Sequence, residues 1–103
     1  MVVIVVYVPA THIDVVKQAM FDAGAGKIGD YSQCAWQVLG QGQFQPTTDA
    51  RPFIGQANTL SQIDEYRVEI VCEDKYLNNV IASMIAAHPY EEPAYHAYPS
   101  MVN

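Results

Sequence analysis

The sequence is short of basic residues. Its 103 residues include five Lys and Arg against eleven Asp and Glu, and the formal net charge is −6. Nucleic acids and anionic membranes are bound through clustered basic side chains, and no stripe of Lys and Arg runs along this chain. We therefore expect neither nucleic acid nor a membrane surface among its partners.

Cysteine is equally scarce, and long hydrophobic runs are absent. Cys34 and Cys72 are too few for the disulfide framework of a small secreted domain. Both lie in apolar, strand-like runs, so we expect buried thiols in a reducing compartment. The apolar run at residues 2–8 is too short to span a bilayer, and no basic segment precedes it. The sequence thus predicts a cytoplasmic protein.

Charged residues make up only 16% of the chain, whereas 50% of the residues are hydrophobic. A disordered chain has the opposite balance, so this composition predicts a folded protein. The length fits a single domain over residues 1–103 with one hydrophobic core. A fairly apolar surface is expected to remain after folding, which favours self-association.

The hydrophobic pattern predicts four strands and two helices. The β-branched run at 2–8 is typical of a central strand, with Val3, Val5 and Tyr7 or their alternates beneath the helices. The remaining strands are predicted at 34–39, 63–72 and 94–98, and the helices at 12–23 and from Asp74 to the residue before Pro89. The order βαββαβ is that of a ferredoxin-like α+β sandwich with one antiparallel sheet.

Local signals place the helix ends. Thr11 and Asp14 have the spacing of a capping box with Asp in place of Glu. Gly24 is typical of the residue that follows a helix. Asp74 is predicted to cap the second helix and Pro89 to end it.

The connection at 40–62 is long for a hairpin, and loops of such length are usually functional or disordered. It contains Phe44, Phe53, Ile54 and Leu60, which are too apolar for a free tether. We expect it to fold as an extended arm, between the second and third strands, that packs on a neighbouring subunit.

Gly24, Gly26 and Gly29 match the G-x-G-x-x-G string of dinucleotide-binding proteins. That site requires a strand before the string and a helix after it, whereas here the order is reversed. The glycines are therefore interpreted as a helix end and tight turns. A loop of this kind can also present backbone N–H groups to an anion.

The closing segment, residues 88–96, has two histidines, two adjacent carboxylates, two tyrosines and two prolines. Because Pro fixes φ and restricts the residue before it, these side chains lie on stiff backbone. His88, Glu91 or Glu92, and His96 could hold a divalent metal such as zinc or copper. The alternative is that His88 caps the helix end while the prolines and tyrosines shape a subunit contact.

Two enzyme-like readings are disfavoured. Adjacent side chains on an extended segment point to opposite faces, so Glu91 and Glu92 are not expected to form a facing acid–base pair. Cys34, close to Trp36, has no evident neighbouring base and is better explained as a core residue. Trp36 fits the core and an interface equally well.

Four motifs in order resemble those of the insert domain of Nif-three-like proteins, also called GTP cyclohydrolase type-two homologues. They are Gly24–Tyr31 running into Cys34 and Trp36, Gly40–Pro46, Pro52–Gly55 and His88–Tyr95. The first six residues of the last motif also resemble the His-Pro-Tyr-x-x-Pro signature of CutA divalent-cation tolerance proteins. The match covers essentially the whole chain.

The resemblance implies a CutA/PII-like fold that assembles as a homo-trimer. In the full-length family a dinuclear metal site lies in flanking parts that this sequence does not contain, so no hydrolase activity is expected of this chain, interpreted as a free-standing insert. The expected ligand or interface residues are Gly24, Gly26, Gly29, Tyr31, Trp36, Phe44, Phe53, Gly55, Pro89, Tyr90, Glu91, Glu92 and Tyr95.

Two functions stay open at this point. One is a non-catalytic, oligomeric sensing or interaction module that binds a small molecule or a protein partner in clefts between subunits. The other is a CutA-like protein that binds a divalent metal ion through His88, Glu91 and His96.

Overall fold

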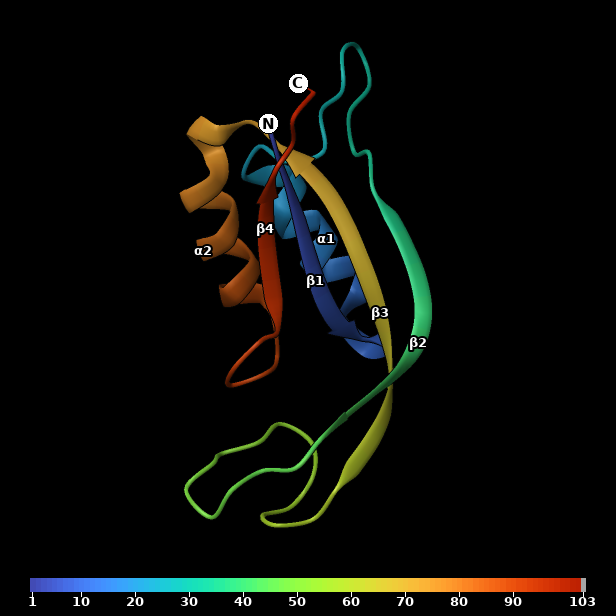
Figure 1. Cartoon of the computed structure of the whole chain (residues 1–103), viewed down its shortest axis with the longest axis vertical. Coiled ribbons are helices and arrows are strands. Elements are labelled where there is room, and N and C mark those ends of the chain that lie inside the picture. The colour runs from blue at the N-terminus through green and yellow to red at the C-terminus, as the bar shows by residue number, and fades with distance from the viewer. Residues whose placement is uncertain (103) are drawn as a thin grey trace.

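The computed structural model describes residues 1–102 and has the expected α+β sandwich (Figure 1). Four strands form one antiparallel sheet in the order β2-β3-β1-β4. The strands are β1 (Val2–Pro9), β2 (Trp36–Phe44), β3 (Ser61–Cys72) and β4 (Tyr95–Pro99), and the helices are α1 (Ile13–Asp22) and α2 (Leu77–Ala87). The βαββαβ order predicted from the sequence is confirmed. None of the helices in residues 1–102 is both long and apolar enough to cross a membrane.

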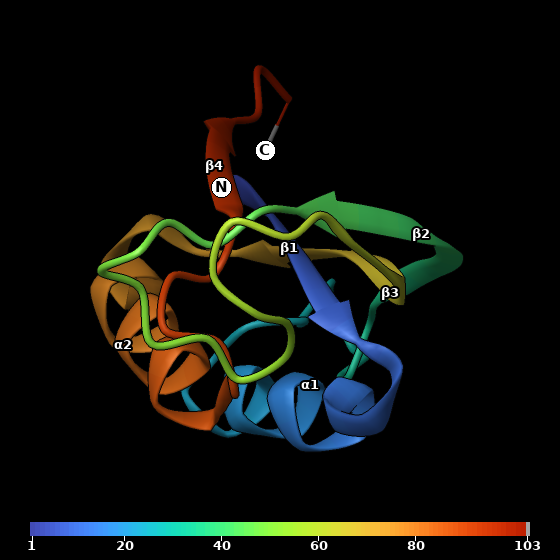
Figure 2. The same ribbon diagram turned by 90° about the horizontal axis from the view of Figure 1, so that it is seen from below.

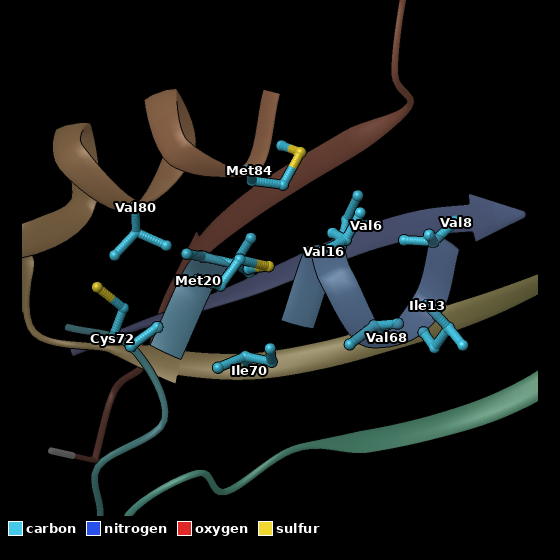
Figure 3. Packing of buried hydrophobic residues seen from close by; sticks show 12 residues of the cluster. Val6, Val8, Ile13, Val16, Met20, Val68, Ile70, Cys72, Val80 and Met84 are labelled. Carbon is cyan, nitrogen blue, oxygen red and sulfur yellow. The ribbon is translucent and has the colours of Figure 1, made fainter. Parts of the chain in front are cut away.

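The main core cluster lies between the sheet and the two helices, on one face of the sheet. On β1 the alternates Ile4, Val6 and Val8 face the helices rather than Val3, Val5 and Tyr7. Figure 3 shows the β1 and β3 side chains meeting those of α1 and α2. The fully buried members include Ile4, Val6, Val8, Val16, Met20, Val68, Ile70, Cys72, Val80 and Met84.

Cys72 is a buried thiol, as expected, but Cys34 is not. Cys34 precedes β2 in the loop and is only partly buried. The strand predicted at 34–39 begins only at Trp36, so Cys34 lies in the loop before it rather than in the core.

Each helix begins later than the capping signals predicted. Short 3₁₀ turns, Ala10–His12 and Asp74–Tyr76, lead from the strands into α1 and α2. Neither helix has a side-chain hydrogen bond at its N-cap. The hydroxyl of Thr11 instead contacts His12 Nδ1 at 2.8 Å, so the predicted capping roles of Thr11 and Asp74 are wrong.

The predicted end of α1 at Gly24 is confirmed. Gly24 has φ +119° and its N–H donates to Phe21 O, while the N–H of Ala25 donates to Met20 O. This pair of hydrogen bonds is the Schellman arrangement. It favours glycine because the residue after the helix end must adopt a positive φ.

The predicted arm is a strand at both ends. β2 pairs with β3 from Trp36 opposite Glu69 to Phe44 opposite Ser61, whereas β1 extends only to Glu65. The outer part of the hairpin therefore leaves the sheet as a two-stranded ribbon (Figure 1). Residues 45–60, here called the arm loop, connect its strands, and they curl back beneath the lower ends of both helices (Figure 2).

Candidate functional site

His88 connects three parts of the fold. It is the C-cap of α2, and its own N–H donates to Met84 O. Its side chain is 6% exposed. Nε2 lies 2.8 Å from Tyr7 O, and Nδ1 accepts the N–H of Tyr90 at 3.1 Å. Because a carbonyl can only accept, Nε2 carries the proton and the neutral ring ties β1 to the closing segment.

Burial lowers the pKa of His88 below its ordinary value of 6.5, against opposing effects of the Tyr7 hydrogen bond and Glu65. A second proton on Nδ1 would also face the N–H of Tyr90, where only an acceptor fits. His88 is therefore a neutral, structural residue, and neither ring nitrogen is left to ligate a metal without breaking one of these bonds.

Tyr90 is held over the sheet by Glu65. Its hydroxyl donates to Glu65 Oε2 at 2.7 Å, and burial, followed by this hydrogen bond, raises the pKa of Tyr90. The other oxygen, Oε1, lies over Gly42 on β2, where a Cβ atom would collide with it. Gly42 is thus required for this position of the Glu65 side chain.

A pocket of about 530 Å³ lies between the arm loop and the closing segment. Phe44 and Phe53 come from the arm, Glu65 from β3, and Tyr90, Glu91 and Glu92 from the closing segment. The ring centres of Phe44 and Tyr90 are 6.2 Å apart. The ring of Phe53 packs edge-on against the ring of His12, with 5.5 Å between the ring centres. The Arg51 N–H donates to Glu91 Oε1 at 2.9 Å, so the arm loop is anchored on both sides of the pocket.

The structure brings five of the predicted residues together and separates the others. Those that line the pocket are Phe44, Phe53, Tyr90, Glu91 and Glu92. Pro89, Gly55 and Tyr95 flank this region in sequence without lining the pocket. The remaining ones, Gly24, Gly26, Gly29, Tyr31 and Trp36, belong to the link before β2 or to its first residue.

The link before β2 does not meet the closing segment within one chain. The Gly26 N–H donates to Val71 O, near the end of β3, whereas His88 reaches Tyr7, near the opposite end of the sheet (Figure 1). The N–H groups of Ile28 and Tyr31 bond to each other's carbonyls, so these donors are already used inside the loop.

Glu91 and Glu92 differ from the sequence expectation. The backbone bends over residues 90–92, so it is not an extended segment, and both carboxylates line the pocket. Glu65, Gly42 and Tyr7 are pocket residues that the sequence analysis missed. The available signal was the pair of glycines in β2, since glycine in a strand often marks a close approach.

The three candidate metal ligands lie apart. His88 is buried, Glu91 holds the arm loop, and His96 is exposed on β4 opposite Val5. No group of three or more His, Cys, Asp or Glu side chains suited to holding a metal ion occurs within residues 1–102.

The face of the sheet turned away from the helices is open and partly apolar. The register places Trp36, Val38 and Tyr98 on it, and Trp36 and Tyr98 are 56% and 53% exposed. The same register places Tyr7, Gly42 and Glu65 on this face, and a second, smaller hollow adjoins the pocket at these three residues.

Comparison with solved structures defines the fold class. CutA from Archaeoglobus fulgidus superposes with a TM-score of 0.71 at 13% identity, covering 100% of this chain and 87% of that one. CutA1 from Shewanella sp. SIB1 gives a TM-score of 0.71 at 19% identity, covering 99% and 82%. The chain therefore has a CutA/PII-like fold.

Other proteins are similar to this chain at higher sequence identity. A Bacillus cereus protein related to NIF3 has a TM-score of 0.82 and 39% identity, covering 97% of this chain and 25% of that one. The proteins named GTP cyclohydrolase 1 type 2 homolog are 48% identical over 91 residues in Mycobacterium leprae, and 46% identical over 96 residues in Halalkalibacterium halodurans. These matches cover 88% and 93% of this chain but only 24% and 26% of the relatives. No family model matches the chain.

The resemblance drawn from the four motifs is thus confirmed: the chain is related to NIF3-family proteins and is similar to one segment of them. It spans about a quarter of the length of the curated relatives that it matches.

Proposed function

We propose that this chain is a non-catalytic binding module whose ligand is a small molecule held between the arm loop and the closing segment. The observation that carries the proposal is the pocket itself. Its volume of about 530 Å³ falls within the usual range of roughly 300–1,000 Å³ for small-molecule sites. Its walls come from the arm, β3 and the closing segment, as is common where ligands bind between elements.

Hydrogen bonds hold the side chains of the pocket in place without a ligand, which supports the interpretation of the pocket as a binding site. Tyr90 is fixed by Glu65 on one side and by the His88 ring on the other. Glu91 is fixed by the Arg51 N–H. Side chains that are ordered before binding cost less entropy when a ligand arrives.

The proposal assigns no reaction to this chain. The relatives' name refers to GTP cyclohydrolase, but the chain matches only about a quarter of those proteins. A nucleoside triphosphate would meet three glutamates in the pocket, and no Lys, Arg or His lines it. Incubation of the purified chain with GTP, with product analysis by chromatography, tests this point; turnover abolished by Glu92→Gln would overturn it.

A homo-oligomer, and specifically a trimer, is part of the same proposal. The open sheet face exposes Trp36 and Tyr98, and large exposed apolar side chains on one face are typical of an interaction surface. Light scattering should give a trimer mass for the wild type and a smaller mass for Val38→Glu. Val15→Glu, on the exposed side of α1, is the matched control. A monomer mass for the wild type would contradict this proposal.

The location in a reducing compartment, the cytoplasm, also belongs to this proposal. Its support is that Cys34 and Cys72 are both free thiols, and cell fractionation tests it.

Binding in the pocket can be tested by nuclear magnetic resonance. Small aromatic compounds added to the isotopically labelled protein should shift the amide signals of residues 42–54 and 90–94. Gly42→Val is the disrupting variant because a Cβ there displaces Glu65. Gly40→Val is the control, since the nearest atom to a Cβ at Gly40 is Glu65 O at 4.0 Å. If no compound in the set shifts these signals, the binding proposal fails.

A further inference from the structure

The pocket has an uncompensated negative charge. Glu65, Glu91 and Glu92 line it, and the lining contains no Lys, Arg or His. Arg67 lies in the adjoining hollow, but its guanidinium pairs with Glu69 at 3.5 Å. Arg51 is not a lining residue of the pocket, and its backbone N–H donates to Glu91 Oε1. No basic group of the lining is thus available to balance the three carboxylates.

Two of the carboxylates have spare hydrogen-bonding capacity. Glu65 uses Oε2 for the hydroxyl of Tyr90, and the hydrogen bonds found across residues 1–102 leave Oε1 without a donor. Glu92 likewise has neither a hydrogen bond nor an ion pair in this part of the chain. An ionised carboxylate accepts several donors, so each can receive an N–H from a bound molecule.

Aromatic rings stand beside these carboxylates. Phe44 and Tyr90 are tilted by 53° with their centres 6.2 Å apart, and Phe53 is held by its edge contact with His12. The face of an aromatic ring attracts a cation, and aromatic cages are the usual receptors for organic ammonium groups. The apolar remainder of the wall, which includes Pro46 and Ile54, suits the hydrocarbon part of the same molecule.

We infer that the ligand of this pocket is an organic ammonium compound, a small molecule with an aromatic or aliphatic body and a protonated amine that points to Glu65 and Glu92. This inference rests on the proposed binding function. A bare divalent ion is a poorer match, because the site is large and partly apolar and no metal-binding group of three side chains occurs in residues 1–102. Phosphate compounds are disfavoured by the same carboxylates.

The test uses three probes with the same phenyl group and different charge: phenethylamine, phenethyl alcohol and phenylacetate. Each is titrated into the labelled full chain at pH 7 and low salt, and the amide shifts of residues 42–54 and 90–94 give the affinity. We expect the amine to bind about fivefold to tenfold more tightly than the alcohol. Phenylacetate should show no saturation in these signals.

Two variants test the charge of the site. Glu65→Gln keeps an acceptor for Tyr90 and removes the charge, so it should weaken amine binding about fivefold and leave alcohol binding unchanged. Glu73→Gln makes the same change beyond the far end of β3 and should have no effect. If Glu65→Gln does not fold, Glu92→Gln replaces it, because Glu92 is exposed.

The possible results distinguish an error in the ligand class from an error in the proposed binding site. Equal binding of amine and alcohol, or tighter binding of phenylacetate, overturns the ammonium inference while the pocket remains a binding site. No shift with any probe overturns both. Shifts of the same amides that follow protein concentration, with no further change on adding any probe, would show that a second copy of the chain fills the pocket, and they would overturn both as well.

Discussion

Replacement of His88 by alanine tests whether this ring holds the closing segment in place. The ring donates from Nε2 to Tyr7 O and accepts the N–H of Tyr90 at Nδ1. Alanine removes both hydrogen bonds and leaves the Tyr7 carbonyl and the Tyr90 N–H without a partner in a partly buried region. Because Tyr90 lines the pocket and bonds to Glu65, the wall of the pocket formed by the closing segment should loosen with it.

The expected loss follows from the two orphaned groups. An unsatisfied buried polar group costs about 1–3 kcal/mol. Water entering the space left by the ring offsets part of that cost, so we expect the free energy of unfolding to fall by about 2–4 kcal/mol. Such a loss is measurable, since domains of this size are stable by roughly 5–15 kcal/mol.

The measurement is urea denaturation at fixed protein concentration, because association contributes to the stability of an oligomer. His96→Ala is the matched control. His96 is exposed on β4, so this change should stay within about 0.5 kcal/mol. If His88→Ala costs less than about 1 kcal/mol, or no more than His96→Ala, the structural role of His88 is refuted.

The pH dependence of the free energy of unfolding tests the role of the His88 ring independently. The folded pKa of His88 is lowered from 6.5 by burial, so the unfolded chain binds more protons at this site than the folded chain. The contribution of His88 to stability is therefore complete above pH 6.5 and is lost as the pH falls through the folded pKa. Wild type should lose stability on acidification between these pKa values, and His88→Ala should lose less.

The sequence predicted most of the fold because its patterns are local. The continuous β-branched run of β1, the alternation in β3 and the helical spacing in α1 and α2 are each visible within one segment, so the element order follows directly. The ends of the elements were harder. A 3₁₀ turn before each helix uses the residues that had the spacing of a cap, and single-residue signals do not distinguish the two.

The outer hairpin was missed for a different reason. Gly40 and Gly42 weaken the strand signal of β2, since glycine has a low strand propensity. Glu65 pairs with Gly40 in the register, and its carboxylate lies over Gly42 two residues further along β2. The need for space at Gly42 therefore depends on pairing between residues far apart in the chain. Only the folded structure therefore identifies Gly42 and Glu65 as parts of the site.

The closing segment was predicted from the sequence to be the polar centre of the chain, but the structure gives its residues different roles from those expected. Sequence alone offers His88 as a metal ligand because an imidazole near neutral pH can ligate, donate or accept. Burial and two backbone partners commit both of its nitrogens. The carboxylates that remain available, on Glu65 and Glu92, lie on different elements, so their proximity could not be read from spacing.

Three further predictions concern the residues around this pocket. Tyr90→Phe removes the hydrogen bond to Glu65 and should lower the free energy of unfolding by about 1 kcal/mol, measured by urea denaturation; no loss would show that the bond is formed only weakly in solution. Gly42→Ala should cost more than Gly40→Ala, because a Cβ at Gly42 meets Glu65 Oε1 whereas the nearest atom at Gly40 is 4.0 Å away; equal losses in the same assay would contradict the packing. Calorimetry with zinc or copper provides the last test. His88 has no nitrogen free to ligate, so any affinity of the folded wild type should persist in His88→Ala at temperatures where the variant stays folded. His96 is exposed, so His96→Ala is the variant that should weaken adventitious binding. A selective loss in His88→Ala would mean that metal competes successfully with the Tyr90 N–H, and it would restore His88 as a ligand.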